Sequence, residues 1–160
     1  MMNKSNINHS VKKGILITGV IGEDVHVTGI RILEHALRSA GFNVYSLGIH
    51  NSQEDFINAA LEANADVIMI SSLAGHAQLL VEGFRDKCIE AGLDDILLYI
   101  GGQLVIHAEN WDKIEKIFKD MGFDRVYKPF TLPEPVIEDL EKDLEMRRRK
   151  NGCTQQEMAG

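Results

Sequence analysis

Short apolar segments alternate with amphipathic segments along the chain from residue 14 onward. The apolar segments are rich in β-branched residues and only a few residues long, which is typical of buried strands. Because they are apolar on both faces, they predict a parallel sheet that is covered by helices on both sides. We place the strands at Gly14–Val20, Val44–Ile49, Val67–Ser71, Ile96–Ile100 and Arg125–Tyr127.

The segments between these strands have the spacing of helices. The first places apolar residues on one face and polar residues, among them Glu34, on the opposite face, which we expect to be exposed. The second opens with a capping-box pattern formed by Ser52 and Asp55. We place the later helices at residues 52–64, 76–91 and 109–121, and the last from about Pro133. Three helices are followed by a glycine, which a left-handed C-cap favours: Gly41, Gly92 and Gly122.

The alternation of strands and helices predicts the fold class. Five strand–helix repeats indicate the α/β class, as a single flavodoxin-like (Rossmann-like) domain with a five-stranded parallel sheet and helices on both faces. We expect the strand order 2-1-3-4-5. The domain is expected to span residues 14–146, after a flexible N-terminus at residues 1–13. Residues 147–160 lack apolar content, so we expect a disordered tail there.

Composition excludes several classes of partner. The 160 residues include 17 Lys+Arg and 24 Asp+Glu, which gives a net charge of −7. Nucleic acids and anionic membranes require a concentrated basic surface, so we expect neither as a partner. Cys88 and Cys153 form no Cys-x-x-Cys pair, and no apolar run reaches the length of a membrane span. Together these features favour a soluble, cytoplasmic protein with reduced thiols.

The candidate chemistry lies in three loops, which follow the first, third and fourth strands. In open α/β sheets a ligand binds beyond the carboxyl ends of the strands, where the strand order reverses. The first loop does not continue as a dinucleotide-binding G-x-G-x-x-G, and Glu23 and Asp24 stand where a phosphate would need donors. The third strand ends in Ser71-Ser72 and lacks the aspartate of a phosphorylation receiver.

The first loop contains the pair Asp24-x-His26. A carboxylate there can accept the second N–H of the imidazole, fix its tautomer and raise the basicity of the nitrogen that faces a metal. Taken alone, the pair more often marks an exposed loop histidine beside an acid, and Gly29 together with the Ser and Gly-Gly loops at the same edge is what favours a metal-bound histidine. A direct zinc or iron site is a further alternative, because four histidines follow strands at the same edge: His26, His50, His76 and His107.

Together the three loops resemble the cobalamin-binding family with the motif D-x-H-x-x-G…S-x-L…G-G. The elements stand here as Asp24-Val-His26-Val-Thr-Gly29, Ser71-Ser-Leu73 and Gly101-Gly102. The chain is similar in particular to the small (S, or sigma) subunits of glutamate mutases, also called methylaspartate mutases, over roughly residues 14–145. Segments that carry this similarity include Gly41-Phe-Asn-Val44 and Met121-Gly-Phe-Asp-Arg-Val-Tyr127. Ala74, His76 and His107 depart from the pattern of those subunits.

The resemblance implies a role for each motif residue. His26 would replace the dimethylbenzimidazole arm as the lower axial ligand of cobalt, Asp24 would be its hydrogen-bonded partner, and Gly29 would give room to the nucleotide tail. The tail would lie in a slot between the first loop and the third and fourth strands. The implied cofactor-binding residues are Glu23, Asp24, Val25, His26, Val27, Gly29, Ser71, Ser72, Leu73, Gly101, Gly102, Gln103, Leu104, Val105, Ile106 and His107.

The reaction implied is the radical carbon-skeleton rearrangement of L-glutamate to L-threo-3-methylaspartate, with adenosylcobalamin as cofactor. The resemblance further implies a catalytic barrel (epsilon, or E) subunit as partner, with two copies of each subunit, and no catalytic residue in this chain. The alternative is a corrinoid carrier of a methyltransferase system. Such carriers usually have a helical domain ahead of the D-x-H loop, and only about 13 residues precede the first strand here. A cobalamin-dependent sensor is the third alternative, although no output module accompanies the domain.

Overall fold

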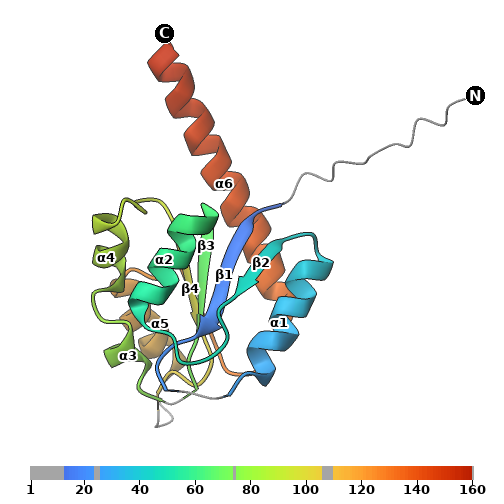
Figure 1. Ribbon diagram of the computed structural model, residues 1–160, viewed down its shortest axis with the longest axis vertical. Coiled ribbons are helices and arrows are strands. Elements are labelled where there is room, and N and C mark those ends of the chain that lie inside the picture. Colours follow the sequence, from blue (N-terminus) through green and yellow to red (C-terminus); the bar gives the residue numbers. More distant parts are fainter. Residues whose placement is uncertain (1–12, 24–25, 74, 106–109, 160) are drawn as a thin grey trace, which may run out of the picture.

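Five parallel strands form one sheet in the computed structural model, which describes residues 13–23, 26–73, 75–105 and 110–159. The sheet has the order β2-β1-β3-β4-β5, which confirms the predicted topology. All four strand pairs are parallel, so the carboxyl ends of the strands share one edge, at the bottom of Figure 1. The strands are β1 (Ile15–Val20), β2 (Asn43–Ser46), β3 (Val67–Ser71), β4 (Leu97–Gly101) and β5 (Arg125–Tyr127).

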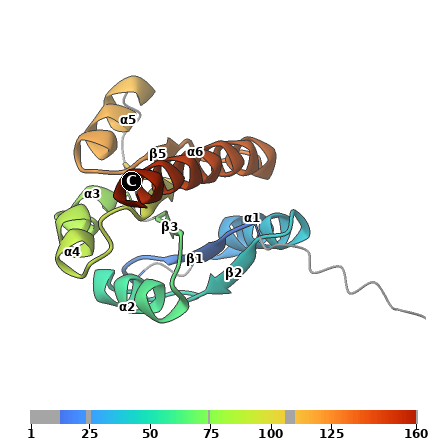
Figure 2. The ribbon, with the colours of Figure 1, turned by 90° about the horizontal axis from the view of Figure 1, so that it is seen from above.

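Helices cover both faces of this sheet (Figure 2). Ser52 and Asp55 form the predicted capping box at the start of the second helix, and Gly41, Gly92 and Gly122 all have a positive φ. The helices are α1 (Thr28–Ser39), α2 (Gln53–Ala63), α3 (Ala77–Leu80), α4 (Phe84–Glu90), α5 (Trp111–Asp120) and α6 (Pro133–Ala159). Within the described ranges, no helix is long and apolar enough to cross a membrane.

The core has two layers, one on each face of the sheet. Side chains of α2, α3, α4 and α5 pack on one face, around the fully buried Phe56, Phe84 and Phe118. Side chains of α1 and α6 pack on the other face, around Leu37 and Leu140. The strands are therefore buried on both sides, which explains their continuous apolar sequences.

Two expectations about helices are wrong. The helix expected over residues 76–91 is divided into α3 and α4, because Gly83 adopts a φ of +70° between them. Glu34 does not face solvent: it is buried, and its carboxylate accepts a hydrogen bond of 2.6 Å from the hydroxyl of Thr18 in β1. Helical spacing could not reveal this contact, because the partner hydroxyl belongs to a strand.

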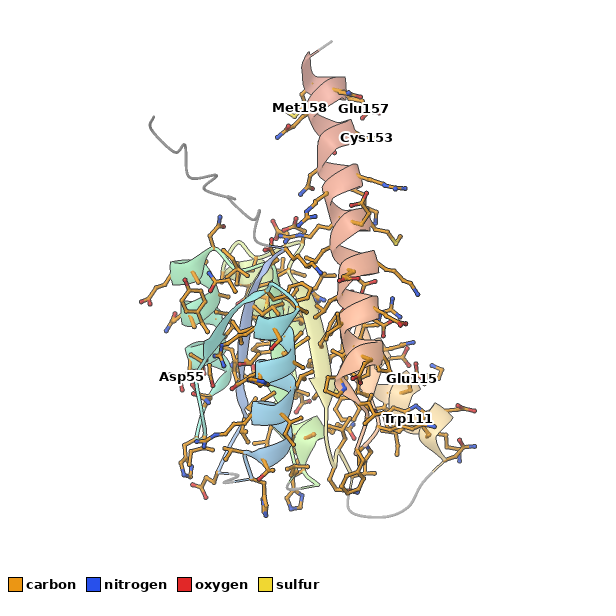
Figure 3. All side chains as sticks on the ribbon, turned by 90° about the vertical axis from the view of Figure 1, so that its right-hand side faces the viewer. Asp55, Trp111, Glu115, Cys153, Glu157 and Met158 are labelled. Atoms are coloured by element: carbon orange, nitrogen blue, oxygen red, sulfur yellow. The ribbon has the colours of Figure 1, made fainter. Side chains whose placement is uncertain are left out.

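The C-terminal residues also differ from expectation. Helix α6 includes residues 147–159, which we expected to form a disordered tail, and it extends beyond the rest of the domain (Figure 1). Cys153, Glu157 and Met158 project from this extension (Figure 3). Helix-forming Arg, Lys, Gln, Glu and Met outweigh the single Gly152 here, and a helix satisfies its own backbone hydrogen bonds without burial. Residues 1–12, the greater part of the expected flexible N-terminus, lie outside the described residues.

Polar contacts fasten α6 to the sheet at two levels. In the middle of β4, where Tyr99 pairs with Arg125, the guanidinium of Arg125 donates to the carboxylate of Asp143 at 2.8 and 3.0 Å, and the hydroxyl of Tyr99 donates to the same carboxylate. Near the amino edge, Arg147 donates to Asp66 at 2.6 Å. These contacts place the first half of α6 beside α1, on the face opposite α2.

Candidate functional site at the carboxyl edge

The loops after β1, β3 and β4 all leave the sheet at its carboxyl edge. Strand β1 is followed in the chain by β2, which lies on one side of it, and β3 is followed by β4 on the other side. The chain therefore winds in opposite directions from the boundary between β1 and β3. This boundary is the topological switch point, where ligands of open α/β sheets bind.

On one side of the switch point, Asn51 joins the loops after β1 and β2. Its buried side-chain amide donates to the carbonyl groups of Val20, Leu47 and Gly48 at 3.1, 3.4 and 2.9 Å. Its backbone carbonyl accepts from the amide of Gly22 at 2.8 Å. Asn51 therefore determines where the backbone turns away from β1 toward the D-x-H segment.

On the other side, the loops after β3 and β4 are hydrogen-bonded to each other. The amide of Ser72 donates to the carbonyl of Gly101, and the amide of Gly75 donates to the carbonyl of Gln103, both at 3.1 Å. An isolated antiparallel bridge between His76 and Val105 continues the pairing. The Ser-x-Leu and Gly-Gly segments consequently form one connected wall.

The first motif loop presents an exposed histidine and an open glycine. His26 is exposed just before α1, and Gly29 lies exposed in the first turn of that helix. Apart from its two chain neighbours and the backbone of its own helix, no atom of the described residues lies within 4 Å of a Cβ atom built on Gly29. The loop therefore leaves space on the side where the resemblance places a nucleotide tail. Asp24 and Val25 lie outside the described residues.

The wall formed by the other two motifs contains a buried hydroxyl. Ser71 is half-buried at the end of β3, whereas Ser72 is fully buried, and Ser72 Oγ has no hydrogen-bond partner among the described residues. A buried polar group is normally paired, so this one is available to a ligand or to a bound water. Gly101 and Gly102 are half-buried beside it, and Leu104 is buried.

The structure brings the described motif residues to one edge, as the sequence predicts. Glu23, Val27, Leu73, Gln103 and Val105 lie in the same three loops. Ile106 and His107 lie outside the described residues, as does Ala74. The role of each residue toward a ligand remains a prediction.

Two residues that shape this edge were not predicted from the sequence. The first is Asn51, which appears in the sequence only as a polar residue between the second strand and the cap of the following helix. Leu80 is the other: its side chain would lie 2.9 Å from a Cβ on Gly22, so α3 packs directly against the loop after β1. The contact depends on the break after α3, which helical spacing did not predict.

A direct metal site formed by several histidines receives no support. In the part of the chain that the structure describes, no group of three or more His, Cys, Asp or Glu residues could hold a metal ion. His26, His50 and His76 therefore do not form such a site with other described residues. A metal bound here would need most of its ligands from another molecule, and an exposed His26 can supply one.

Comparison with protein families identifies residues 14–132 with the B12 binding domain. The chain is 50% identical over 137 residues to the glutamate mutase sigma subunit of Clostridium tetani, covering 86% of this chain and 100% of that protein. It is 51% identical to the sigma subunit of Fusobacterium nucleatum, with 84% of this chain and 98% of that protein covered. It is 46% identical to glutamate mutase sigma subunit 2 of Haloarcula marismortui, with 91% of this chain and 97% of that protein covered.

Solved structures share the fold at lower identity. A cobalamin-binding protein from Desulfitobacterium hafniense matches with a TM-score of 0.61 at 19% identity, over 86% of this chain. The monomethylamine corrinoid protein of Methanosarcina barkeri matches with a TM-score of 0.64 at 23% identity, over 84% of this chain. The matched region spans 59% and 58% of those two chains, respectively. A signal receiver domain from Mycobacterium tuberculosis matches with a TM-score of 0.54, so the fold alone does not specify a ligand.

Proposed function

This chain belongs to the family of glutamate mutase sigma subunits, and on that premise we propose that His26 binds the cobalt of cobalamin as its lower axial ligand. The chain is the cobalamin-binding component of an isomerase, and adenosylcobalamin is the cofactor of glutamate mutase. The observation that carries the proposal is the exposed position of His26 at the switch point, beside a glycine with open space around it.

Three features of the site fit a cobalamin whose nucleotide tail enters the domain. The open space around Gly29 would accommodate the tail as it passes His26. The connected wall of Ser71–Gly75 and Gly101–Val105 would form the opposite side of the slot. The buried Ser72 Oγ would supply a polar contact inside the wall. The remaining predicted contacts, including Asp24 and His107, belong to the same proposal.

Adenosylcobalamin, when bound, supplies the radical chemistry of the rearrangement of L-glutamate to 3-methylaspartate. The residues of this chain bind and orient it. His26 Nε2 or Nδ1 would donate a lone pair to the metal, and the carboxylate of Asp24 would accept a hydrogen bond from the N–H of the other ring nitrogen and keep the imidazole in one tautomer. The apolar core behind β1 and β3 would exclude water from the slot.

A sigma subunit works with a partner catalytic subunit. We propose that this partner is a barrel that encloses the adenosyl group and the substrate, and that two copies of each subunit assemble. The alternative function, a corrinoid carrier for methyl transfer, is supported by fold similarity alone, at 23% identity or below. The relatives named above, at 46–51% identity, are sigma subunits, which favours the mutase.

The proposal is tested by electron paramagnetic resonance of cob(II)alamin bound to the purified chain, with and without ¹⁵N-labelled histidine. The axial nitrogen splitting should change with the label in the wild type and should lose this dependence in His26→Gly. His50→Gly is the matched control, because His50 is exposed after β2 with a φ of 60°, which glycine adopts freely. A splitting that ignores the label in the wild type contradicts the assignment.

A further inference from the structure

The turn between β5 and α6 has an unusual residue at its tip. The amide of Thr131 donates to the carbonyl of Lys128 at 3.3 Å, which closes a four-residue turn with Pro129 in its second position. Phe130 occupies the third position with a φ of +62°. Proline at the second position and a positive φ at the third are features of a type II turn, and glycine or asparagine is favoured at that third position. A bulky side chain there is an outlier.

Packing of the side chain within the described fold does not compensate for this conformation, because Phe130 is 99% exposed. Leu132, two residues later, is 67% exposed. A strained backbone that presents an aromatic side chain to solvent points to a functional contact outside the chain. Scattered exposed apolar residues are ordinary, but a strained one at a fixed tip is not.

The turn is held in place by its neighbours. The hydroxyl of Thr131 also donates to the carbonyl of Lys128, at 2.7 Å. Trp111 lies at the start of α5 (Figure 3). The ammonium of Lys128 lies 5.7 Å from the centre of the Trp111 ring. Both contacts restrict the turn, so little conformational entropy would be lost when Phe130 is covered.

The turn lies at the same edge as the cobalamin site. Tyr127, the last residue of β5, pairs with Gly101 of the Gly-Gly motif. Phe130 follows Tyr127 by three residues, beyond the carboxyl end of the strand. Leu79, which is 75% exposed, belongs to α3, the helix after the Ser-x-Leu loop. An exposed apolar residue therefore follows the Ser-x-Leu segment of the wall, and another follows the strand that pairs with the Gly-Gly segment.

We propose that Phe130 is an anchor through which this chain docks on the catalytic subunit of the mutase, with Leu132 and Leu79 as flanking contacts. The proposal rests on the proposed function, because the catalytic subunit must approach the cofactor from the carboxyl edge. A rigid aromatic side chain is the residue type that most often dominates binding energy at an interface. The net charge of −7 opposes pairing with a second copy and binding to an anionic membrane, which leaves the catalytic subunit as the occupant.

The test compares Phe130→Gly and Phe130→Ala with Ile89→Ala. Ile89 is an exposed apolar residue near the end of α4, at the opposite edge of the sheet, so it is a matched control. Each full-length variant is assayed for thermal unfolding, for adenosylcobalamin binding, and for its dissociation constant with the purified catalytic subunit of the same organism at saturating adenosylcobalamin.

An anchor predicts opposite effects on stability and assembly. Phe130→Gly should raise the unfolding temperature, because glycine relieves the backbone strain, and should raise the dissociation constant at least tenfold. Phe130→Ala should raise the dissociation constant by a similar factor, but it should not raise the unfolding temperature. If the isolated chain binds adenosylcobalamin, both Phe130 variants should bind it with the affinity of the wild type. Ile89→Ala should bind the catalytic subunit with the dissociation constant of the wild type.

Other outcomes overturn the inference in distinguishable ways. If the Phe130→Gly variant binds the catalytic subunit as tightly as the wild type does, Phe130 is not an anchor, and the proposed function still stands. A change in self-association of the chain, with assembly unaltered, identifies a second copy as the occupant and overturns the inference. A wild-type chain that binds no cobalamin, alone or with the catalytic subunit, overturns the proposed function as well.

Discussion

Gly102 lies against the carbonyl group of Ser72 so closely that a Cβ atom on Gly102 would be 2.4 Å from that oxygen. Gly102 also has a φ of +107°, which side chains rarely adopt. The second glycine of the Gly-Gly motif is therefore required by the packing of the chain itself, whether or not a ligand is present. Gly29 in the first motif differs, because the described structure leaves its surroundings open.

Gly102→Ala should destabilise the fold. The new methyl group would clash with backbone atoms, which cannot rotate away, and the positive φ adds strain, so we expect a loss of about 2–4 kcal/mol in the free energy of unfolding. Urea denaturation followed by circular dichroism measures this loss. Gly48→Ala is the control, since Gly48 has a positive φ without a close neighbour. Equal losses in the two variants would show that the contact with Ser72 contributes nothing.

Gly29→Ala should instead leave the fold intact and impair the site. Alanine favours the helix relative to glycine, so the free energy of unfolding should stay within about 1 kcal/mol of the wild type. The added methyl group would enter the space that we assign to the nucleotide tail, and the affinity for cobalamin should fall at least tenfold. Titration of cobalamin absorbance measures this affinity. Unchanged affinity would place the tail away from Gly29.

The alternation of strands and helices could be predicted from the periodic pattern of apolar residues, but contacts between distant segments could not. The strands were predictable because both of their faces are buried, and the switch point followed from the strand order. Glu34 was misplaced because its spacing on α1 resembles a solvent-facing residue, and only Thr18 on β1 shows otherwise. Asn51 and Phe130 were missed for a related reason, since hydrogen bonds to three carbonyl groups and a positive φ have no periodic signature.

Asn51→Asp should destabilise the base of the first motif loop more than Asn51→Ala does. Aspartate keeps the shape of the side chain but turns acceptor oxygens toward the carbonyl groups of Val20, Leu47 and Gly48, so repulsion adds to the lost hydrogen bonds. We expect losses of about 2–4 kcal/mol for aspartate and about 1–2 kcal/mol for alanine. Urea denaturation at pH 7 measures both, with Asn58→Asp, at an exposed position within α2, as control. A milder effect for aspartate than for alanine would refute this account of the amide.

The ionised carboxylate of Asp143 stabilises the fold, and this stabilisation is lost at low pH. Burial raises the pKa of this carboxyl group, but hydrogen bonds from Arg125 and Tyr99 lower the pKa by more, so the net shift is downward. A carboxyl pKa that is lower in the folded than in the unfolded state stabilises the fold above the unfolded pKa of about 4. This contribution disappears as the pH falls through the lower, folded pKa.

Asp143→Asn should therefore cost stability at pH 7, by about 1–3 kcal/mol, because a neutral amide no longer pairs with the guanidinium of Arg125. The difference from the wild type should shrink as the pH is lowered below about 4, where the carboxyl group of the unfolded chain takes up its proton, and should vanish below the lower pKa of the folded state. Urea denaturation at a series of pH values measures the difference. Glu138→Gln, at an exposed position of the same helix, should show little difference at any pH. A cost for Asp143→Asn that stays constant with pH would assign the effect to packing of the side chain and not to its charge.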